Sequence, residues 1–181
     1  MVTKSEMPFS ELHEIAVRTA KNIHLQDSAE HGRTIDKTGN IKKFVGGIDW
    51  VIIDINQDTR IAIHNHPNEY KTPETFSDYD IYNFLSRKYL CEIIVCGYGY
   101  YFYLRRGTYK GLSMDIKSEV ARIRARVKQK IKKEYLADDS NDSKTLRRRI
   151  KEMNVKAERA YHKELCEFLS GKGLSYGRVK L

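Results

Sequence analysis

The spacing of apolar residues predicts both helix and strands in the first part of the chain. From Ser10 to Leu25, apolar residues recur every three or four positions, as on one face of an amphipathic helix. Short apolar stretches separated by turn-forming residues follow. They predict a hairpin between Thr34-Ile35 and Ile41–Val45, and further strands at Trp50–Ile55 and Arg60–His64. We therefore expect a sheet in this region.

The pattern then returns once more to a helix followed by strands. Helical spacing within Asp78–Tyr89 predicts a helix that begins near Ser77. The apolar runs Glu92–Gly97 and Tyr100–Leu104 predict a second hairpin. The order helix, strands, helix, strands indicates an α/β or α+β domain that ends near Arg106.

The last third of the chain has the pattern of two long helices. A narrow apolar stripe runs through the otherwise charged residues 115–135, and a second helical pattern covers residues 146–171. An acidic, turn-rich stretch at residues 137–143 separates them, so two antiparallel helices could bury their stripes against each other. We therefore divide the chain into a first domain, residues 1–112, and a basic helical extension, residues 113–181.

Composition narrows the class of protein. Of 181 residues, 40% are hydrophobic and 31% charged, which provides enough apolar material for one packed core. No N-terminal segment resembles a signal peptide, and no apolar run approaches the roughly 20 residues needed to cross a bilayer, so we expect a cytoplasmic protein. The three cysteines are odd in number and lack CxxC spacing, which predicts free thiols.

Positive charge is concentrated in the helical extension. The whole chain has 33 Lys or Arg against 24 Asp or Glu, a formal charge of +9. Within residues 115–151 there are thirteen basic residues against six acidic ones. A surface of this kind can neutralise phosphates, so nucleic acid is one possible partner. The alternative interpretation is that these charges are the solvated faces of two ordinary helices.

Two histidines stand where a central strand is predicted to end. His64 and His66 are two residues apart, so both side chains should project from one face of the sheet, and Pro67 then ends the strand. Asp80 follows Ser77 by three residues at the predicted helix start and could supply a third ligand. Two His and one Asp match the ligand count of a catalytic zinc site, which keeps a fourth position for water.

Each half of this pattern also has a structural interpretation. Ser77 and Asp80 fit a capping box, in which both side chains only satisfy backbone N–H groups. A His-x-His pair is often no more than two hydrogen-bonded histidines. The combination of the two halves, separated by a polar loop, favours a metal site over either interpretation alone.

This combination resembles the signature of a known family. His64-Asn65-His66-Pro67, nine further residues and then Ser77-x-x-Asp80 is similar to the JAMM motif of JAB/MPN-domain metallopeptidases, and the wording HNHP is most similar to their RadC-like branch from bacteria and phages. The resemblance covers about Glu30 to Arg106. It implies a cytidine deaminase-like α/β (α+β) core with a central mixed sheet, and zinc-dependent hydrolysis of a peptide or isopeptide bond.

The resemblance also assigns roles to residues. It makes His64, His66 and Asp80 ligands of Zn²⁺, and Ser77 a hydrogen-bond donor to the oxyanion that forms during amide hydrolysis.

The family further needs an upstream glutamate as general base. Glu30 is the best match to the expected place, and Glu11 and Glu14 on the predicted N-terminal helix are the alternatives. The gap of ten residues between His66 and Ser77 is longer than in the commonest form of the motif. We expect the extra residues, near 68–75, to lengthen a loop, which need not move the ligands.

Two functions of different classes follow. The first is a zinc peptidase acting on a peptide or protein substrate, such as one carrying a ubiquitin-like tag, with the helical extension recruiting a partner. The second is a nucleic-acid-associated protein that uses a JAB-like scaffold and the basic helices 115–151. This second protein would be a metal-dependent nuclease or a non-enzymatic component of a phage or mobile element.

Overall fold

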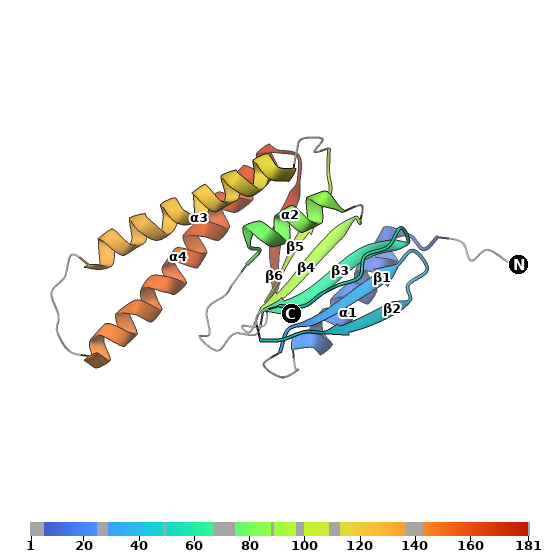
Figure 1. Ribbon diagram of the computed structural model, residues 1–181, viewed down its shortest axis with the longest axis horizontal. Helices are drawn as coiled ribbons and strands as arrows, with labels where there is room; N and C mark the ends of the chain where they lie inside the picture. Colours follow the sequence, from blue (N-terminus) through green and yellow to red (C-terminus); the bar gives the residue numbers. More distant parts are fainter. Residues whose placement is uncertain are drawn as a thin grey trace, which may run out of the picture.

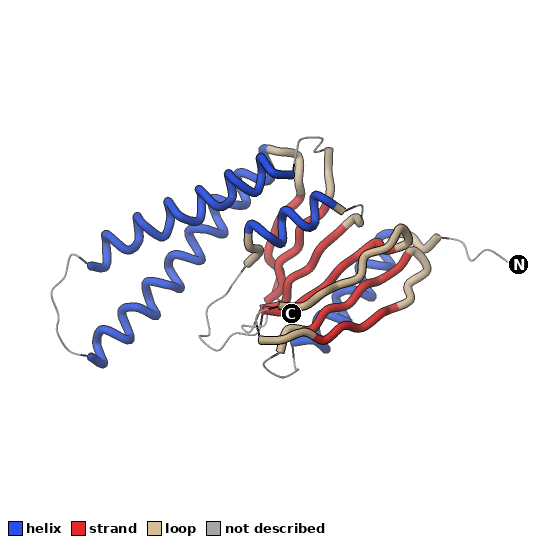
Figure 2. Tube along the Cα trace, viewed as in Figure 1, coloured by secondary structure: helices blue, strands red, loops and turns tan. Residues whose placement is uncertain are grey.

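The computed structural model describes most of the chain as an α+β fold around one six-stranded mixed sheet (Figure 1; Figure 2). The described residues are 6–24, 29–48, 50–66, 75–87, 89–96, 100–108, 113–136 and 143–180. The helices are α1 (Phe9–His24), α2 (Asp78–Ser86), α3 (Ser113–Leu136) and α4 (Ser143–Gly171). The strands are β1 (His31–Asp36), β2 (Ile41–Val45), β3 (Thr59–His66), β4 (Cys91–Cys96), β5 (Tyr100–Arg105) and β6 (Ser175–Lys180).

The strands lie in the order β2-β1-β3-β4-β5-β6. Every neighbouring pair is antiparallel except β3 and β4, which are parallel. A parallel pair needs a crossover connection, and α2 lies in the segment that supplies it. This topology places the end of β3 beside the start of α2, which are the two places where the sequence predicts metal ligands.

Helices cover both faces of the sheet (Figure 1). On one face, α1 packs on Ile61 and Ile63 of β3 within a hydrophobic cluster. On the other face, α2, α3 and α4 share a second cluster with Ala62 of β3. Successive residues of a strand point to opposite faces, so β3 contributes to both clusters in alternation. His64 and His66 follow Ala62 on the side of α2.

Most of the predicted elements are present. The N-terminal helix, both hairpins, the strand that carries the histidines, the helix after Ser77 and the two long C-terminal helices lie within a few residues of their predicted bounds. Cys91 is buried, and it and Cys166 are free thiols. Within the described part of the chain, no helix is both long and apolar enough to cross a membrane. The predicted loop at residues 68–74 and the link at 137–142 lie outside the described residues.

The strand predicted at Trp50–Ile55 is wrong. This segment is not part of the sheet, because both edges of β1 are already occupied by β2 and β3. It lies instead over the face of the sheet that carries His64. A Cβ atom on Gly32 would come within 2.7 Å of Ile53 Cγ1, so glycine allows the segment to approach β1 closely.

The C-terminal third of the chain contributes both a strand and core residues to the sheet domain. After α4, the unpredicted strand β6 pairs with β5 and forms one edge of the sheet. Ile116 and Val120 of α3 and Leu165 of α4 belong to the same buried cluster as Ala62 of β3. Elements on both sides of the division predicted after residue 112 therefore share one sheet and one core.

Candidate metal centre

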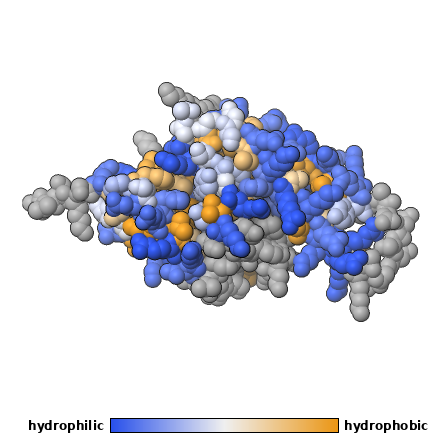
Figure 3. Space-filling model, turned by 180° about the vertical axis from the view of Figure 1, so that it is seen from behind, coloured by the Kyte–Doolittle hydropathy of each residue, from blue (hydrophilic) through white to orange (hydrophobic). Residues whose placement is uncertain are grey.

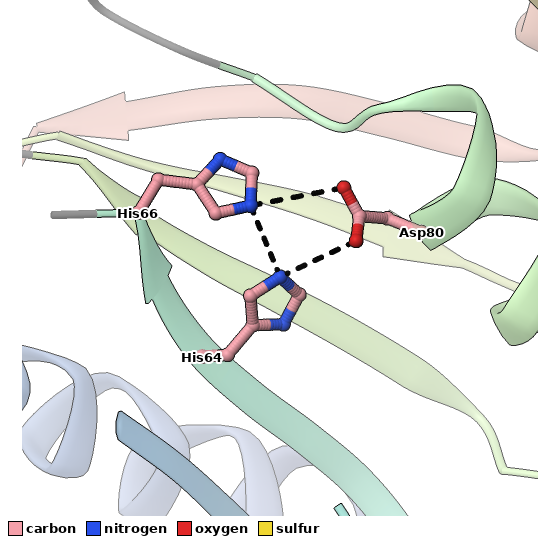
Figure 4. Close-up of side chains that lie close together, drawn as sticks. All are labelled: His64, His66 and Asp80. Carbon is pink, nitrogen blue, oxygen red and sulfur yellow. Dashed lines mark hydrogen bonds and ion pairs between the residues drawn. The ribbon is translucent and has the colours of Figure 1, made fainter. Parts of the chain in front are cut away.

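His64 and His66 lie on the same face of β3, as their spacing predicts. Their Nε2 atoms are 3.2 Å apart and face each other (Figure 4). His64 is buried, with only 5% of its surface exposed. Two ring nitrogens that converge in this way can share a cation.

Asp80 reaches the two histidines from the first turn of α2. Ser77 is the N-cap of this helix: its hydroxyl accepts a hydrogen bond from Asp80 N–H at 3.1 Å, while Asp80 Oδ2 accepts one from Ser77 N–H at 2.7 Å. The Ser77 hydroxyl also donates to Asp80 Oδ2 at 2.7 Å. The capping box is therefore present, and it fixes the carboxylate that faces the histidines.

The three side chains have the spacing of a metal site. Asp80 Oδ1 lies 3.5 Å from His64 Nε2, and Asp80 Oδ2 lies 3.7 Å from His66 Nε2. Ligand atoms bonded at about 2.0–2.1 Å to one tetrahedral ion lie about 3.3 Å from each other. One ligand atom from each residue lies within 4.8 Å of the other two. These residues fit a metal ion and form a group that could hold one.

The electrostatics of the two histidines differ. Burial by itself would lower the pKa of His64, but hydrogen bonds to Asp80 and Glu92 and the charges of these carboxylates raise it to about 10. Burial lowers the pKa of His66 to about 4; the charge of Asp80 opposes this shift, and the positive charges of His64 and Arg124 add to it. Near neutral pH, His66 therefore offers a free lone pair, whereas His64 holds a proton that a metal ion would displace.

The pKa of Asp80 is shifted to keep its carboxylate charged. Burial would raise the pKa of Asp80. Hydrogen bonds from His64 and Ser77, together with the charges of His64 and His66, hold it well below its usual range. Asp80 is therefore a carboxylate throughout the range in which His66 is neutral. An anionic oxygen beside two imidazoles is a donor set that suits zinc.

A buried glutamate on β4 extends the site in a way that the sequence pattern did not reveal. Glu92 Oε1 lies 3.3 Å from His64 Nδ1, and Glu92 Oε2 accepts a hydrogen bond from the Tyr89 hydroxyl at 2.8 Å. Histidines that bind metals commonly donate their other ring N–H to a carboxylate in this way. The available signal was an acidic residue inside the apolar run Cys91–Cys96, because a buried strand keeps a carboxylate only where it has partners.

Glu30, the predicted general base, lies just before β1 and is buried. It lines the same cavity as the metal-binding group. Asn65, the residue between the two histidines, is bonded to both neighbours of Glu30: its amide donates to Ala29 O at 3.2 Å, and its Oδ1 accepts from His31 N–H. The strand that carries the histidines therefore also positions the backbone of Glu30.

The other two candidates for the general base lie elsewhere. Glu11 and Glu14 are exposed on α1, which covers the opposite face of the sheet. Gly32, by contrast, pairs with His64 in the register of β1 and β3, and Glu30 precedes Gly32 by two residues in an extended chain. Residues two apart share a face, so Glu30 belongs to the face of the histidines.

The cavity at this site has a volume of about 640 Å³. Its floor includes His64 and Glu92, and α2 provides Asp80 on one side. Ile48, residues 50–53 and Ile55 form an apolar wall, in which Trp50 and Ile52 are 56% and 77% exposed. The charged ligands therefore stand at the bottom of a pocket with an apolar rim, which is typical of a small-ligand or peptide site.

No match to the chain is found among known protein families, curated proteins or solved structures. The resemblance to JAB/MPN-domain metallopeptidases therefore stays a prediction carried by the two histidines and the Ser-x-x-Asp pair. The structure brings His64, His66 and Asp80 together and places Glu30 and Ser77 around the same cavity.

The C-terminal elements hold the segment that leads into Ser77. The Tyr161 hydroxyl on α4 donates to Phe76 O at 3.1 Å. Thr75 Oγ1 lies 2.6 Å from the Tyr176 hydroxyl on β6, and both residues are buried. The backbone before the N-cap is therefore tied to both α4 and β6, so these elements form part of the frame of the site.

Arg124 of α3 adds a positive charge close to this frame. It lies 3.4 Å from Glu158 Oε1 and over the ring of Tyr161, 5.0 Å from its centroid. Its charge contributes to the lowered pKa of His66. The third helix thus acts electrostatically on a residue of the candidate metal centre.

Proposed function

We propose that this protein is a metal-dependent hydrolase of peptide or isopeptide bonds, with zinc as its metal and a JAB/MPN-like core. The observation that carries the proposal is the convergence of His64 Nε2, His66 Nε2 and the Asp80 carboxylate at the bottom of a cavity that Glu30 also lines. A zinc ion at this point would supply a Lewis acid that polarises a carbonyl and lowers the pKa of water to about 7.

The chain's own residues would divide the remaining work. Glu30 would accept the proton of the attacking water and deliver it to the leaving amine. Ser77 would hold Asp80 in place through the capping box, and its hydroxyl could turn from Asp80 Oδ2 toward a developing oxyanion. Glu92 would orient His64 by accepting from Nδ1, so that Nε2 faces the cavity.

The lining of the cavity favours a peptide over a phosphodiester as substrate. Three carboxylates line it, those of Glu30, Asp80 and Glu92, and among the described residues Arg87 is the one Lys or Arg that does. With zinc bound, the two charges of the ion and that of Arg87 only balance the three carboxylates, so the cavity has no excess positive charge to attract an anionic phosphate. The apolar residues 50–53 and Ile55 provide a wall along which an extended peptide could lie.

The test is hydrolysis by zinc-loaded protein of a mixture of proteome-derived peptides and lysine isopeptide conjugates, read by mass spectrometry in ¹⁸O-labelled water. We expect defined cleavage sites with one ¹⁸O in each new carboxyl group. The variants Glu30→Gln and His66→Ala should be inactive, and Glu14→Gln, an exposed acid on the opposite face, should cleave like the wild type. Absence of cleavage by the zinc-loaded wild type, or full activity of Glu30→Gln, would contradict the proposal.

A further inference from the structure

The α3–α4 pair carries a strong positive charge on the part that extends beyond the sheet (Figure 1). Residues 128–136 of α3 contain four Lys and one Glu, and residues 147–156 of α4 contain five Lys or Arg and one Glu. Hydrophilic side chains predominate at this end of the molecule (Figure 3). These two stretches therefore hold a net charge of +7, out of +9 for the whole chain.

The acidic residues of these stretches are already paired. Glu134 binds Lys156 at 2.7 Å, and Glu152 lies 3.6 Å from Arg148. Six exposed cations of these stretches have no ion-pair partner among the residues that the structure describes: Lys128, Lys130, Lys132 and Lys133 of α3, and Arg147 and Lys151 of α4. Four of them, Lys128, Lys132, Arg147 and Lys151, stand at intervals of four residues.

Helical spacing arranges these cations in rows. Lys128 and Lys132 follow Arg124 at intervals of four residues, so the three lie along one side of α3 with a rise of about 6 Å between neighbours. Arg147 and Lys151 are likewise four apart, and Lys151 precedes Glu158 by seven residues, which is two helical turns. The ion pair between Arg124 and Glu158 joins the two sides.

We propose that these rows bind the phosphate backbone of a nucleic acid, independently of sequence. Lys128, Lys132, Arg147 and Lys151 of these rows are unpaired, and their regular spacing matches a partner with regularly spaced negative charges. A membrane fits this region less well, because a membrane surface would also need apolar residues beside the cations. The exposed apolar residues here are Leu146 and Ile150, eleven and seven residues before the buried Ala157. At this helical spacing they lie on the side of α4 that faces α3. The proposal does not depend on the hydrolase activity, since Lys128, Lys132, Arg147 and Lys151 do not line the cavity.

The test measures binding of the full-length protein to fluorescent duplex DNA, single-stranded DNA and RNA of about 20 units, by anisotropy at about 50 and 200 mM salt. We expect binding that weakens steeply with salt. In a variant with Gln at positions 128, 132, 147 and 151, affinity at low salt should fall at least about tenfold, and the salt slope should decrease by about 3 to 4. Gln is a good helix former, so the helices should persist, and circular dichroism checks this.

The matched control carries the same loss of four charges elsewhere. Arg18, Lys21, Lys43 and Lys180 are exposed on α1, β2 and β6, and their replacement by Gln should leave binding within about threefold of the wild type. The three probes separate DNA from RNA as the source of the phosphates. No binding to any probe at low salt, equal losses in both variants, or binding only to phosphatidylserine vesicles would overturn the proposal.

Discussion

Ile63 and His64 are neighbours on β3, but they belong to regions with opposite roles. Ile63 points into the cluster under α1, which consists of apolar side chains and Tyr101 and Cys91. His64 points the other way, between two carboxylates under α2. Because a strand alternates its faces, one element can support the fold on one side and hold reactive groups on the other.

The difference between the two faces lies in how burial is compensated. The face under α1 gains free energy simply by removing apolar surface from water. The face under α2 buries His64 and Glu92 and half-buries Asp80, and each of these groups loses hydration. Their mutual hydrogen bonds and the hydroxyls of Ser77 and Tyr89 offset that loss. A buried polar cluster of this kind adds little to stability, which suggests that it is kept for its chemistry.

The largest effect is expected from replacing the candidate metal ligand His66, which should abolish zinc binding but hardly change the stability of the fold. We expect His66→Ala to reduce bound zinc from one ion per chain to less than about 0.1, because two ligands hold zinc poorly. The metal-free unfolding free energy should change by less than about 1 kcal/mol, since the ring lies at the strand end. Metal analysis after gel filtration and urea unfolding give both values, and retention of stoichiometric zinc would show that His66 is not a ligand.

The opposite result is expected at the neighbouring core position. Ile63→Ala should lower the unfolding free energy by about 2–5 kcal/mol through the cavity that it leaves. The folded fraction should still bind one zinc ion with wild-type affinity. A stable Ile63→Ala protein with impaired zinc binding would mean that the two faces are not separate in the way described.

Glu92→Gln tests whether the buried carboxylate acts through His64. We expect zinc affinity to fall about 10- to 100-fold, because the variant loses the carboxylate charge that lies 3.3 Å from His64 Nδ1 and orients the ring. Glu14→Gln is the control, and it should bind zinc normally. Competition with a chromophoric chelator measures both, and equal affinity for the two variants would remove Glu92 from the site.

Zinc affinity should also depend on pH in a defined direction. Because the pKa of His64 is raised to about 10, the metal-free protein carries a proton there at neutral pH, and binding must release it. Apparent affinity should therefore rise about tenfold per pH unit from about 7 to 9. Calorimetry in buffers of different ionisation enthalpy should find about one proton released, and a release near zero would contradict the shifted pKa.

The smallest effect is expected where α4 supports the site from behind. Tyr161→Phe removes the hydrogen bond to Phe76 O and should cost about 1 kcal/mol of stability. It should also weaken zinc binding slightly, because the segment before Ser77 is less fixed. Phe168→Tyr, a hydroxyl added at a half-buried site of the same helix, is the control, and it should leave zinc affinity unchanged.

Local patterns were enough to predict the elements that carry the ligands. The helix Phe9–His24 and the strand with His64 and His66 follow from spacing alone, and so does the helix start at Ser77. What they could not predict depends on contacts between distant segments. The strand β6 contains Gly177, a residue that weakens a strand pattern, and its place is set by the free edge of β5. The segment Trp50–Ile55 has strand-like residues, but β1, which it approaches, is already paired on both sides by β2 and β3.

The candidate site shows the same limit. The histidines and Asp80 could be identified because ligand spacing is a local feature. Glu92 and Tyr161 join the site through strand order and helix packing, which the sequence does not display residue by residue. The contributions of Glu92 and Tyr161 to the candidate site could therefore be recognised only from the folded structure.

The most direct test is a crystal structure of protein loaded with one equivalent of zinc, with anomalous data collected on both sides of the zinc edge. We expect one strong peak at about 2.0–2.2 Å from His64 Nε2, His66 Nε2 and an Asp80 oxygen, with Glu30 facing the fourth position. A peak at any other site, or none at full loading, would contradict the central claim that these three residues hold a metal ion.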